Sequence, residues 1–294
     1  MSQTAFLKWR YILEGVVIMH ETLNELHVQK GSGVLFKIDF EKAFDKVNWT
    51  FLLQILEMKG FPPGWINLVM NTVRGGKVAI RVNDDTGPYF CTHQGLRQGD
   101  PLSPLLFDLA ADALAIMITR AVDSGILKGL CSRLVEKGVS ILQYVDDTIL
   151  LLEDDLEQAR NLKFVLCLFE QMSGLKINFH KSEVICLGNA KERCADFEEI
   201  FTCKAGELPM KYLGIPIDEK RLSLKDWKPV LEKHENKLSC WQGKNLVIGG
   251  RSTLINSSLL SLLLYMLSFY RVPVGVKHKA DSIESNFSVE WGQE

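Results

Sequence analysis

The chain has 294 residues and an ordinary globular composition, with 47% hydrophobic and 24% charged residues. This balance excludes a disordered, collagen-like or disulfide-scaffold protein. The net charge of −2 gives no general attraction for phosphates, so a polynucleotide partner would need a local basic surface. The seven cysteines have no CxxC or Cys/His spacing, and we expect neither a zinc site nor a disulfide partner.

The N-terminal residues lack the apolar core and the cleavage site of a signal peptide. The most apolar stretch, Leu254 to Phe269, is too short to cross a membrane, and we expect a buried helix there. The sequence therefore predicts an intracellular protein, cytoplasmic or nuclear, with no targeting signal and no membrane partner.

Residues 11–29 have the apolar spacing of a helix, which Gly31-Ser-Gly33 ends. From Val34 to Phe40, large apolar residues alternate with other side chains, and this period of two predicts a strand. Asp39 is expected near the C-terminal end of the strand, on the face opposite the large apolar residues.

Residues 44–59 predict one helix, because apolar side chains recur at helical spacing: Phe44, Val47, Phe51 and Ile55. A second helix is expected through 65–73, before two glycines. Residues 77–92 alternate around the turn at 83–87, which predicts a hairpin.

An amphipathic helix is predicted over 102–116, after a segment rich in glycine and proline. Residues 139–153 form two apolar runs around a short acidic centre, which indicates a hairpin. A helix is expected over 155–173, followed by short strands around 175–187 and 209–217.

From 218 onward the pattern is helical and rich in basic residues. These are Lys220, Arg221, Lys225, Lys228, Lys233, Lys237, Lys244 and Arg251. The run fits a surface that follows nucleic-acid phosphates, and it equally fits a solvated helix face paired with glutamates. The mixture of helices with non-adjacent strands predicts an α+β or α/β fold rather than a bundle.

Two acidic positions have settings unlike ordinary surface charge. Asp39 ends an apolar strand, and Asp146 and Asp147 occupy the tip of a hairpin with apolar arms. Adjacent carboxylates repel one another unless a cation offsets their charge, and Mg²⁺ binds a few carboxylates together with substrate phosphates. Three such carboxylates could hold two ions for in-line phosphoryl displacement. Taken alone, an Asp-Asp pair at a hairpin tip fits a plain turn better.

Three segments occur in the order of the central reverse-transcriptase motifs: FKIDFEKAFDKVNW (36–49), QGLRQGDPLSPLLF (94–107) and QYVDDTILL (143–151). Segments 174–184 and 208–217 are similar to the two motifs that follow in LINE-type enzymes. Residues 2–23 and 237–257 resemble, respectively, the stretch before the first catalytic strand and the thumb side of plant elements. The chain thus resembles the reverse transcriptase domain of a LINE-type non-LTR retrotransposon, truncated at both ends.

The resemblance implies an α+β, right-hand polymerase fold. It would have a palm with an antiparallel ferredoxin-like sheet, partial fingers and a helical thumb-like C-terminus. The expected parts are a fingers fragment (1–30), palm (31–46), fingers (47–102), palm (103–217) and a basic thumb-like segment (218–294).

The resemblance assigns catalysis to Asp39, Asp146 and Asp147, which would hold two Mg²⁺ ions, or Mn²⁺ in their place. The Phe40 carbonyl would be an added metal ligand. Phe44 would block a ribose 2′-hydroxyl, although its spacing also fits a core residue. Nucleotide contacts would come from Gln98, Gly99 and Lys181, and Lys181 alone could equally be solvated after its turn.

For the template and primer, the resemblance implies contacts from Arg10, Gly95, Arg97, Tyr212, Leu213 and Gly214. Gly95 and Gly99 would permit close approach of a backbone, or simply form a loop-to-helix junction. The last three residues resemble a primer-grip turn, and a buried hairpin is an alternative for them.

The sequence departs from the family pattern at Trp9, which stands between Lys8 and Arg10 where glycine is usual. Finger strands expected upstream, an endonuclease domain and a Cys/His-rich tail do not fall within these 294 residues. The implied function is RNA-directed DNA polymerase, extending a DNA primer on an RNA template with dNTPs. The alternatives are a catalytically impaired remnant that at most binds RNA, and an intron maturase.

Overall fold

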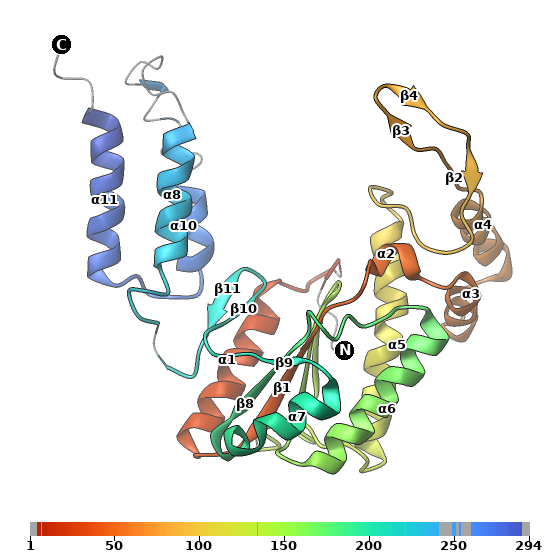
Figure 1. Ribbon diagram of the computed structural model, residues 1–294, viewed down its shortest axis with the longest axis horizontal. Helices are drawn as coiled ribbons and strands as arrows, with labels where there is room; N and C mark the ends of the chain where they lie inside the picture. The colour runs from red at the N-terminus through yellow and green to blue at the C-terminus, as the bar shows by residue number, and fades with distance from the viewer. Residues whose placement is uncertain are drawn as a thin grey trace. The chain divides into compact units, whose positions relative to one another are not determined.

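The computed structural model describes residues 5–6, 8–133, 135–220, 222–240, 249–250, 253 and 260–289. The chain divides into two compact units, Met1–Leu213 and Gly214–Glu294. The first unit combines helices with a central sheet, and the described part of the second is mainly helical (Figure 1).

A five-stranded sheet forms the centre of the first unit, in the order β6-β7-β1-β8-β9. Its strands are β1 (Gly33–Ile38), β6 (Ile141–Tyr144), β7 (Asp147–Leu152), β8 (Glu183–Leu187) and β9 (Lys204–Ala205). Three of the four pairings are antiparallel, and β9 joins β8 in parallel. The predicted antiparallel sheet is thus correct for four strands and wrong for the edge strand β9.

Helices cover both faces of this sheet (Figure 1). Val34, Phe36 and Ile38 of β1 enter a core with apolar residues of α5 (Ser103–Asp123), α6 (Leu156–Ser173) and α7 (Cys194–Phe201). Leu35 on the opposite face is also buried, and α1 (Leu13–Val28) lies on the other side of the sheet from α5 and α6 (Figure 1). Strand β1 therefore carries buried apolar side chains on both faces, as expected for a strand that is covered on both sides.

The helix predicted over 44–59 is broken. The chain forms α2 (Ala43–Lys46) and α3 (Trp49–Met58), because Val47 and Asn48 are extended. The Asn48 side chain accepts hydrogen bonds from the backbone N–H groups of Thr50 and Phe51, at 2.8 and 3.2 Å, and so caps α3. Local capping thus outweighs the continuous helical spacing.

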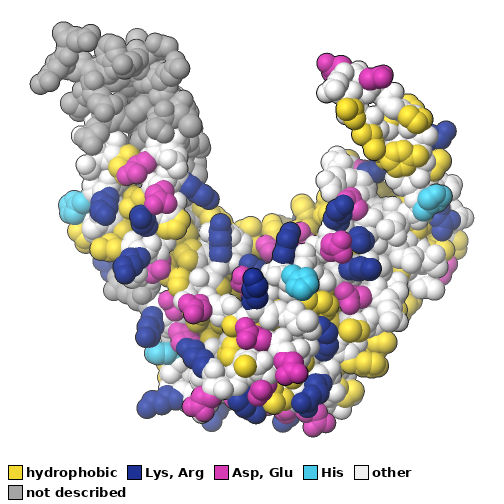
Figure 2. All heavy atoms as spheres, in the orientation of Figure 1, with side chains coloured by type: hydrophobic (Ala, Val, Ile, Leu, Met, Phe, Trp, Pro, Cys, Tyr) yellow, Lys and Arg dark blue, Asp and Glu magenta, His cyan; other side chains and the backbone are white. Residues whose placement is uncertain are grey.

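The next helix and hairpin are where the sequence predicts them. The helix is α4 (Pro63–Arg74), and the hairpin consists of four short strands: β2 (Lys77–Val78), β3 (Arg81–Val82), β4 (Asp85–Thr86) and β5 (Phe90–Cys91). The turn is only Asn83-Asp84, both with positive φ, which suits a two-residue hairpin. Exposed apolar side chains line this hairpin (Figure 2).

Helices α5 and α6 agree with their patterns, and Gly174 ends α6 with a φ of 76°. Residues 188–201, for which no element is predicted, form the 3-10 helix η1 (Gly188–Arg193) and α7. This short helix buries Phe197 and Phe201, and the Phe201 ring stacks on Phe36 of β1 with centroids 4.2 Å apart.

The strands β10 (Met210–Tyr212) and β11 (Ile215–Ile217) form a hairpin, and the boundary between the units falls within its turn. The second unit continues with α8 (Lys228–Cys240), α10 (Leu260–Leu267) and α11 (Val274–Val289). Among the described helices, none combines the length and hydrophobicity of a membrane span.

The predicted helical character of this second unit is confirmed where it is described. The expected buried helix at 254–269 is wrong in part, because Leu264 and Leu267 are exposed, and 254–259 lie outside the described residues. Among the predicted basic residues, Arg221, Lys244 and Arg251 lie outside the described part, as does the side chain of Lys237. The others are exposed: Lys220, Lys225, Lys228 and Lys233.

Candidate active site

Strand register brings Asp39 and Asp147 together. The last pair of β1 and β7 is Ile38 with Thr148, so the next position along β1, Asp39, falls opposite Asp147. Both strands are held in place by buried apolar side chains on either side of the sheet. The two carboxylates thus lie at one end of a rigid part of the fold.

Asp146 reaches the same end of the sheet through a tight turn. Tyr144 of β6 pairs with Asp147 of β7, and Val145 and Asp146 form the turn between them. Val145 has a φ of 55°, an unfavourable conformation for a β-branched residue. Such strain is found where the surrounding structure fixes a functional group in place.

The charges of the three aspartates influence one another. Burial raises the pKa of Asp147, and the negative charges of Asp146 and Asp39 raise it further, while the Lys37 ammonium opposes them. Asp39 and Asp146 are exposed, whereas Asp147 is half-buried. The cluster carries more negative charge than Lys37 offsets.

Carboxylate oxygens that repel one another at the edge of a sheet fit a hard divalent cation. In the described part of the chain, no three His, Cys, Asp or Glu side chains form a group already arranged to hold a metal. The aspartates are therefore neighbours whose carboxylates fit a divalent cation by their chemistry.

A loop after α6 fixes the end of β1. The backbone N–H of Asp39 donates to the Ser182 hydroxyl at 3.1 Å, and the backbone N–H of Asn178 donates to the Asp39 carbonyl at 2.7 Å. Lys181 is exposed in this loop, and its backbone N–H donates to the Asn178 carbonyl at 3.0 Å. The fold thus brings Lys181 into the loop that holds Asp39.

Phe40 continues the chain away from Asp39 into the core. It is buried and forms a bridge with Ile177, and its ring lies 6.4 Å from that of Phe169. Phe44 is half-buried and stacks on Phe107 of α5, with ring centroids 4.8 Å apart. Its packing contributes to the core, and the side chain remains partly exposed.

Gly95 is required by the chain's own backbone. It has a φ of 87°, and an added Cβ would lie 2.6 Å from the Asp45 carbonyl oxygen. Its N–H donates to the Val47 carbonyl at 2.8 Å, and its carbonyl accepts from the Trp49 indole at 2.7 Å. The Asp45 backbone therefore occupies the space where a side chain at Gly95 would lie, which fits the alternative of a loop-to-helix junction.

The neighbouring residues of this segment are more open. Gly99 also has a φ of 87°, but nothing lies within 4 Å of an added Cβ. The exposed Gln98 amide is 3.5 Å from the Asp45 carboxylate, a long contact. The exposed Arg97 guanidinium lies against Gly76, at the end of α4.

Tyr212 lies beside Asp147, but its side chain is 1% exposed. Burial raises the pKa of Tyr212, and the Asp147 charge raises it further. Its hydroxyl has no hydrogen-bond partner among the described residues. The buried tyrosine side chain cannot contact a primer, which leaves Leu213 and Gly214, at φ of 49° and 82°, as the accessible turn.

Arg10 at the other end of the chain pairs with Glu14, four residues along, at 2.8 Å. Two neighbours of the aspartates, Lys37 and Ser182, were not predicted. Lys37 could have been found, because it lies two residues before Asp39 and so shares its face of the strand. Ser182 could not, since its contact depends on the loop.

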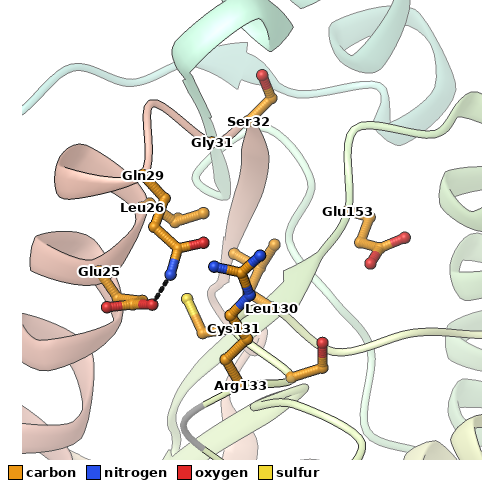
Figure 3. Close-up of a pocket in the computed structure, with 10 residues that line it drawn as sticks. Glu25, Leu26, Gln29, Gly31, Ser32, Leu130, Cys131, Arg133 and Glu153 are labelled. Carbon is orange, nitrogen blue, oxygen red and sulfur yellow. Dashed lines mark hydrogen bonds between the residues drawn. The ribbon is translucent and has the colours of Figure 1, made fainter.

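A cavity of about 160 Å³ lies at the opposite end of the first unit's central strand (Figure 3). Residues from the end of α1, the start of β1 and the 130–133 loop line it, among them Glu25, Ser32 and Arg133. It adjoins Gly33, where β1 begins, and not Asp39 beyond its end, so it is separate from the aspartates.

Comparison with known proteins identifies the family. Residues 1–217 match the family described as reverse transcriptase (RNA-dependent DNA polymerase). The Pol polyprotein of the type-2 retrotransposable element R2DM of Drosophila melanogaster is 27% identical over 222 residues, which cover 72% of this chain. The transposon TX1 149 kDa protein of Xenopus laevis is 27% identical over 273 residues, or 90% of this chain. The chain spans about 20% of the length of each of these relatives.

Solved structures give the same fold. A telomerase from Candida tropicalis, in complex with a TWJ fragment of telomeric RNA, matches 100% of this chain and 44% of its own, with a TM-score of 0.53 and 12% identity. A telomerase from Candida albicans matches 98% of this chain and 49% of its own, with a TM-score of 0.52 and 10% identity. At such low identity the likeness shows the α+β, right-hand polymerase fold alone. By its sequence match, the chain belongs to the reverse transcriptase family.

Proposed function

We propose that the chain is an RNA-directed DNA polymerase, which extends a DNA primer along an RNA template. The convergence of Asp39, Asp146 and Asp147 at one end of the palm sheet supports the proposal most directly. The remnant and maturase alternatives lack a comparable observation in their favour.

Asp39, Asp146 and Asp147 would hold two Mg²⁺ ions, with the Phe40 carbonyl as an added ligand. When bound, the ions supply the positive charge that lowers the pKa of the primer 3′-hydroxyl and neutralises the nucleotide phosphates. The protein's own contribution is then to hold the reacting groups in line and to place charge near them.

The surrounding residues divide the remaining tasks. The Lys181 ammonium, on the loop that holds Asp39, would lie near the departing pyrophosphate. The partly exposed Phe44 ring would exclude a ribose 2′-hydroxyl. Gln98 and Gly99 would contact the nucleotide, and Leu213-Gly214 would contact the primer backbone. Arg10 and Arg97 are proposed to contact the template.

Primer extension on an RNA template tests the proposal. Mg²⁺-dependent incorporation of dNTPs is expected, and Asp146→Asn should abolish it by removing one carboxylate charge while keeping the side-chain shape. Asp123→Asn is the matched control, because Asp123 is an exposed carboxylate at the end of α5 that pairs with Lys137. Incorporation by the parent chain no greater than that of Asp146→Asn would refute polymerase activity.

A further inference from the structure

The segment just before α1 exposes an unusual set of side chains. Phe6, Trp9 and Tyr11 are 58%, 77% and 67% exposed, whereas globular proteins normally bury much of such rings. Lys8 lies among them, with its ammonium 5.1 Å from the centroid of the Trp9 ring. Residue Ala5 before them is 1% exposed, so the segment is anchored at this end.

The backbone holds Trp9 outward in a strained conformation. Its φ is 69°, in the left-handed region that bulky residues rarely adopt. Phe6 also has a positive φ, of 51°. Neither conformation is needed to bury an apolar side chain, because both rings remain exposed. Backbone strain that gains no packing is characteristic of residues placed for contact with a ligand.

The segment belongs to the active-site end of the first unit. It leads directly into α1, where a Cβ on Gly15 would lie 3.0 Å from the Tyr212 hydroxyl. Tyr212 in turn is close enough to Asp147 for that carboxylate to raise its pKa. The other end of α1 borders the cavity at the start of β1 (Figure 3). The segment with the exposed rings therefore leads into the end of α1 that lies nearer to Asp147, and not into the end that borders the cavity.

The charge of the segment selects the partner. Residues 5–13 contain Lys8 and Arg10 and no acid, and the first acid, Glu14, pairs with Arg10. Unpaired bases stack on exposed aromatic rings, and neighbouring cations contact the phosphates of the same strand. A protein partner would favour a contiguous apolar patch, which cations at alternate positions interrupt.

We propose that Trp9 stacks an unpaired base of the RNA template strand beside the active site, while Lys8 contacts its phosphate. This inference rests on the function proposed above, because template RNA is the single strand that such an enzyme binds next to its aspartates. Stacking does not depend on sequence, so the contact would suit any template.

Equilibrium binding without dNTPs tests the inference. The probes are a DNA primer annealed to RNA with a single-stranded RNA overhang, the same duplex with a blunt end, and an overhang made of abasic residues. Trp9→Ala should weaken binding of the RNA overhang by on the order of tenfold. It should leave the blunt and abasic probes unaffected, and Trp9→Phe should retain most of the affinity.

Two further variants separate stacking from folding and from charge. Trp9→Gly relieves the backbone strain and so should fold at least as well as the parent. Its affinity for the RNA overhang should nevertheless fall as much as that of Trp9→Ala. Lys8→Ala should reduce the dependence of log K on log salt by about 1, whereas Trp9→Ala should leave that slope unchanged.

An unchanged affinity of Trp9→Ala for the RNA overhang would overturn the inference and would favour a protein as the partner of this surface. Equal losses on overhang and blunt probes would also overturn it, because the contact would then be to the duplex. Extension by the parent chain is measured in parallel. Trp9-dependent overhang binding without extension would uphold the inference and refute only the polymerase activity.

Discussion

Asp108 of α5 is a buried carboxyl whose titration should control the stability of the first unit. Its side chain is 7% exposed, and neither carboxyl oxygen has a hydrogen-bond partner among the described residues. Burial raises its pKa from the ordinary 3.8 to about 7, and the charge of Asp112 adds to this effect. We consider Asp108→Asn, which keeps the shape and removes the titration.

The magnitude follows from the two pKa values. Below pH 3.8 both folded and unfolded chains carry a protonated Asp108, so it has no effect on the pH dependence. Between 3.8 and about 7 the unfolded chain loses the proton while the folded chain keeps it, so stability falls as pH rises. The difference of roughly three between the two pKa values corresponds to about 4 kcal/mol of unfolding free energy, all of which is lost once the pH exceeds the pKa of the folded state.

Urea denaturation at pH 5, 6, 7 and 8 measures this effect. Relative to the parent chain, Asp108→Asn should gain stability steadily from pH 5 to 7, by roughly 2–3 kcal/mol, and then level off. An unsatisfied amide costs about 1–3 kcal/mol at every pH and so does not alter the slope. Asp123→Asn, an exposed aspartate on the same helix, is the control. Parallel pH profiles for the parent and Asp108→Asn would refute the reasoning.

Four other substitutions have defined outcomes. Gly95→Ala should lower the free energy of unfolding by about 2–4 kcal/mol in urea titrations, because its Cβ meets the Asp45 backbone. Gly99→Ala, at the same φ but in open space, should lower it by only about 1–2 kcal/mol. Equal losses in the two variants would contradict the contact between Gly95 and Asp45. Trp9→Gly should stabilise by roughly 0.5–1 kcal/mol in thermal melts, since relief of a left-handed φ exceeds the added freedom of the unfolded chain. Phe44→Val should lower the ratio of kcat/KM for dNTPs over rNTPs, and an unchanged ratio would assign Phe44 to the core alone.

Local patterns predicted the elements that carry the aspartates. The alternation in β1 and the two apolar arms of the β6–β7 hairpin identify strands by the period of their side chains, and both are confirmed. Side-chain spacing does not predict the break between α2 and α3 at Val47-Asn48, because the helical spacing of apolar residues continues across it. There the Asn48 side chain bonds to the backbone, a competition that hydrophobic spacing does not reveal.

Contacts between distant segments were beyond the sequence. Side-chain patterns do not give the register that places Asp39 opposite Asp147, because it depends on the whole pairing of β1 with β7; only the family resemblance predicted that the two share a site. Burial of Tyr212 likewise depends on Gly15, far away in the chain, which leaves room for the ring. The charges visible in Figure 2 are interspersed over the face of the first unit that it shows, so net charge alone could not locate a binding surface.

The contacts of Gly95 have a consequence for how such a chain can change in evolution. Backbone hydrogen bonds join Gly95 to Val47 and Leu96 to Phe44, at 2.8 and 2.7 Å. The Trp49 indole adds a third bond, to the Gly95 carbonyl. The segment bearing Gln98 is therefore joined to the one bearing Phe44, so a substitution that moves either displaces the other. Sugar discrimination and nucleotide placement would thus be inherited together, and compensating substitutions should occur in pairs across these bonds.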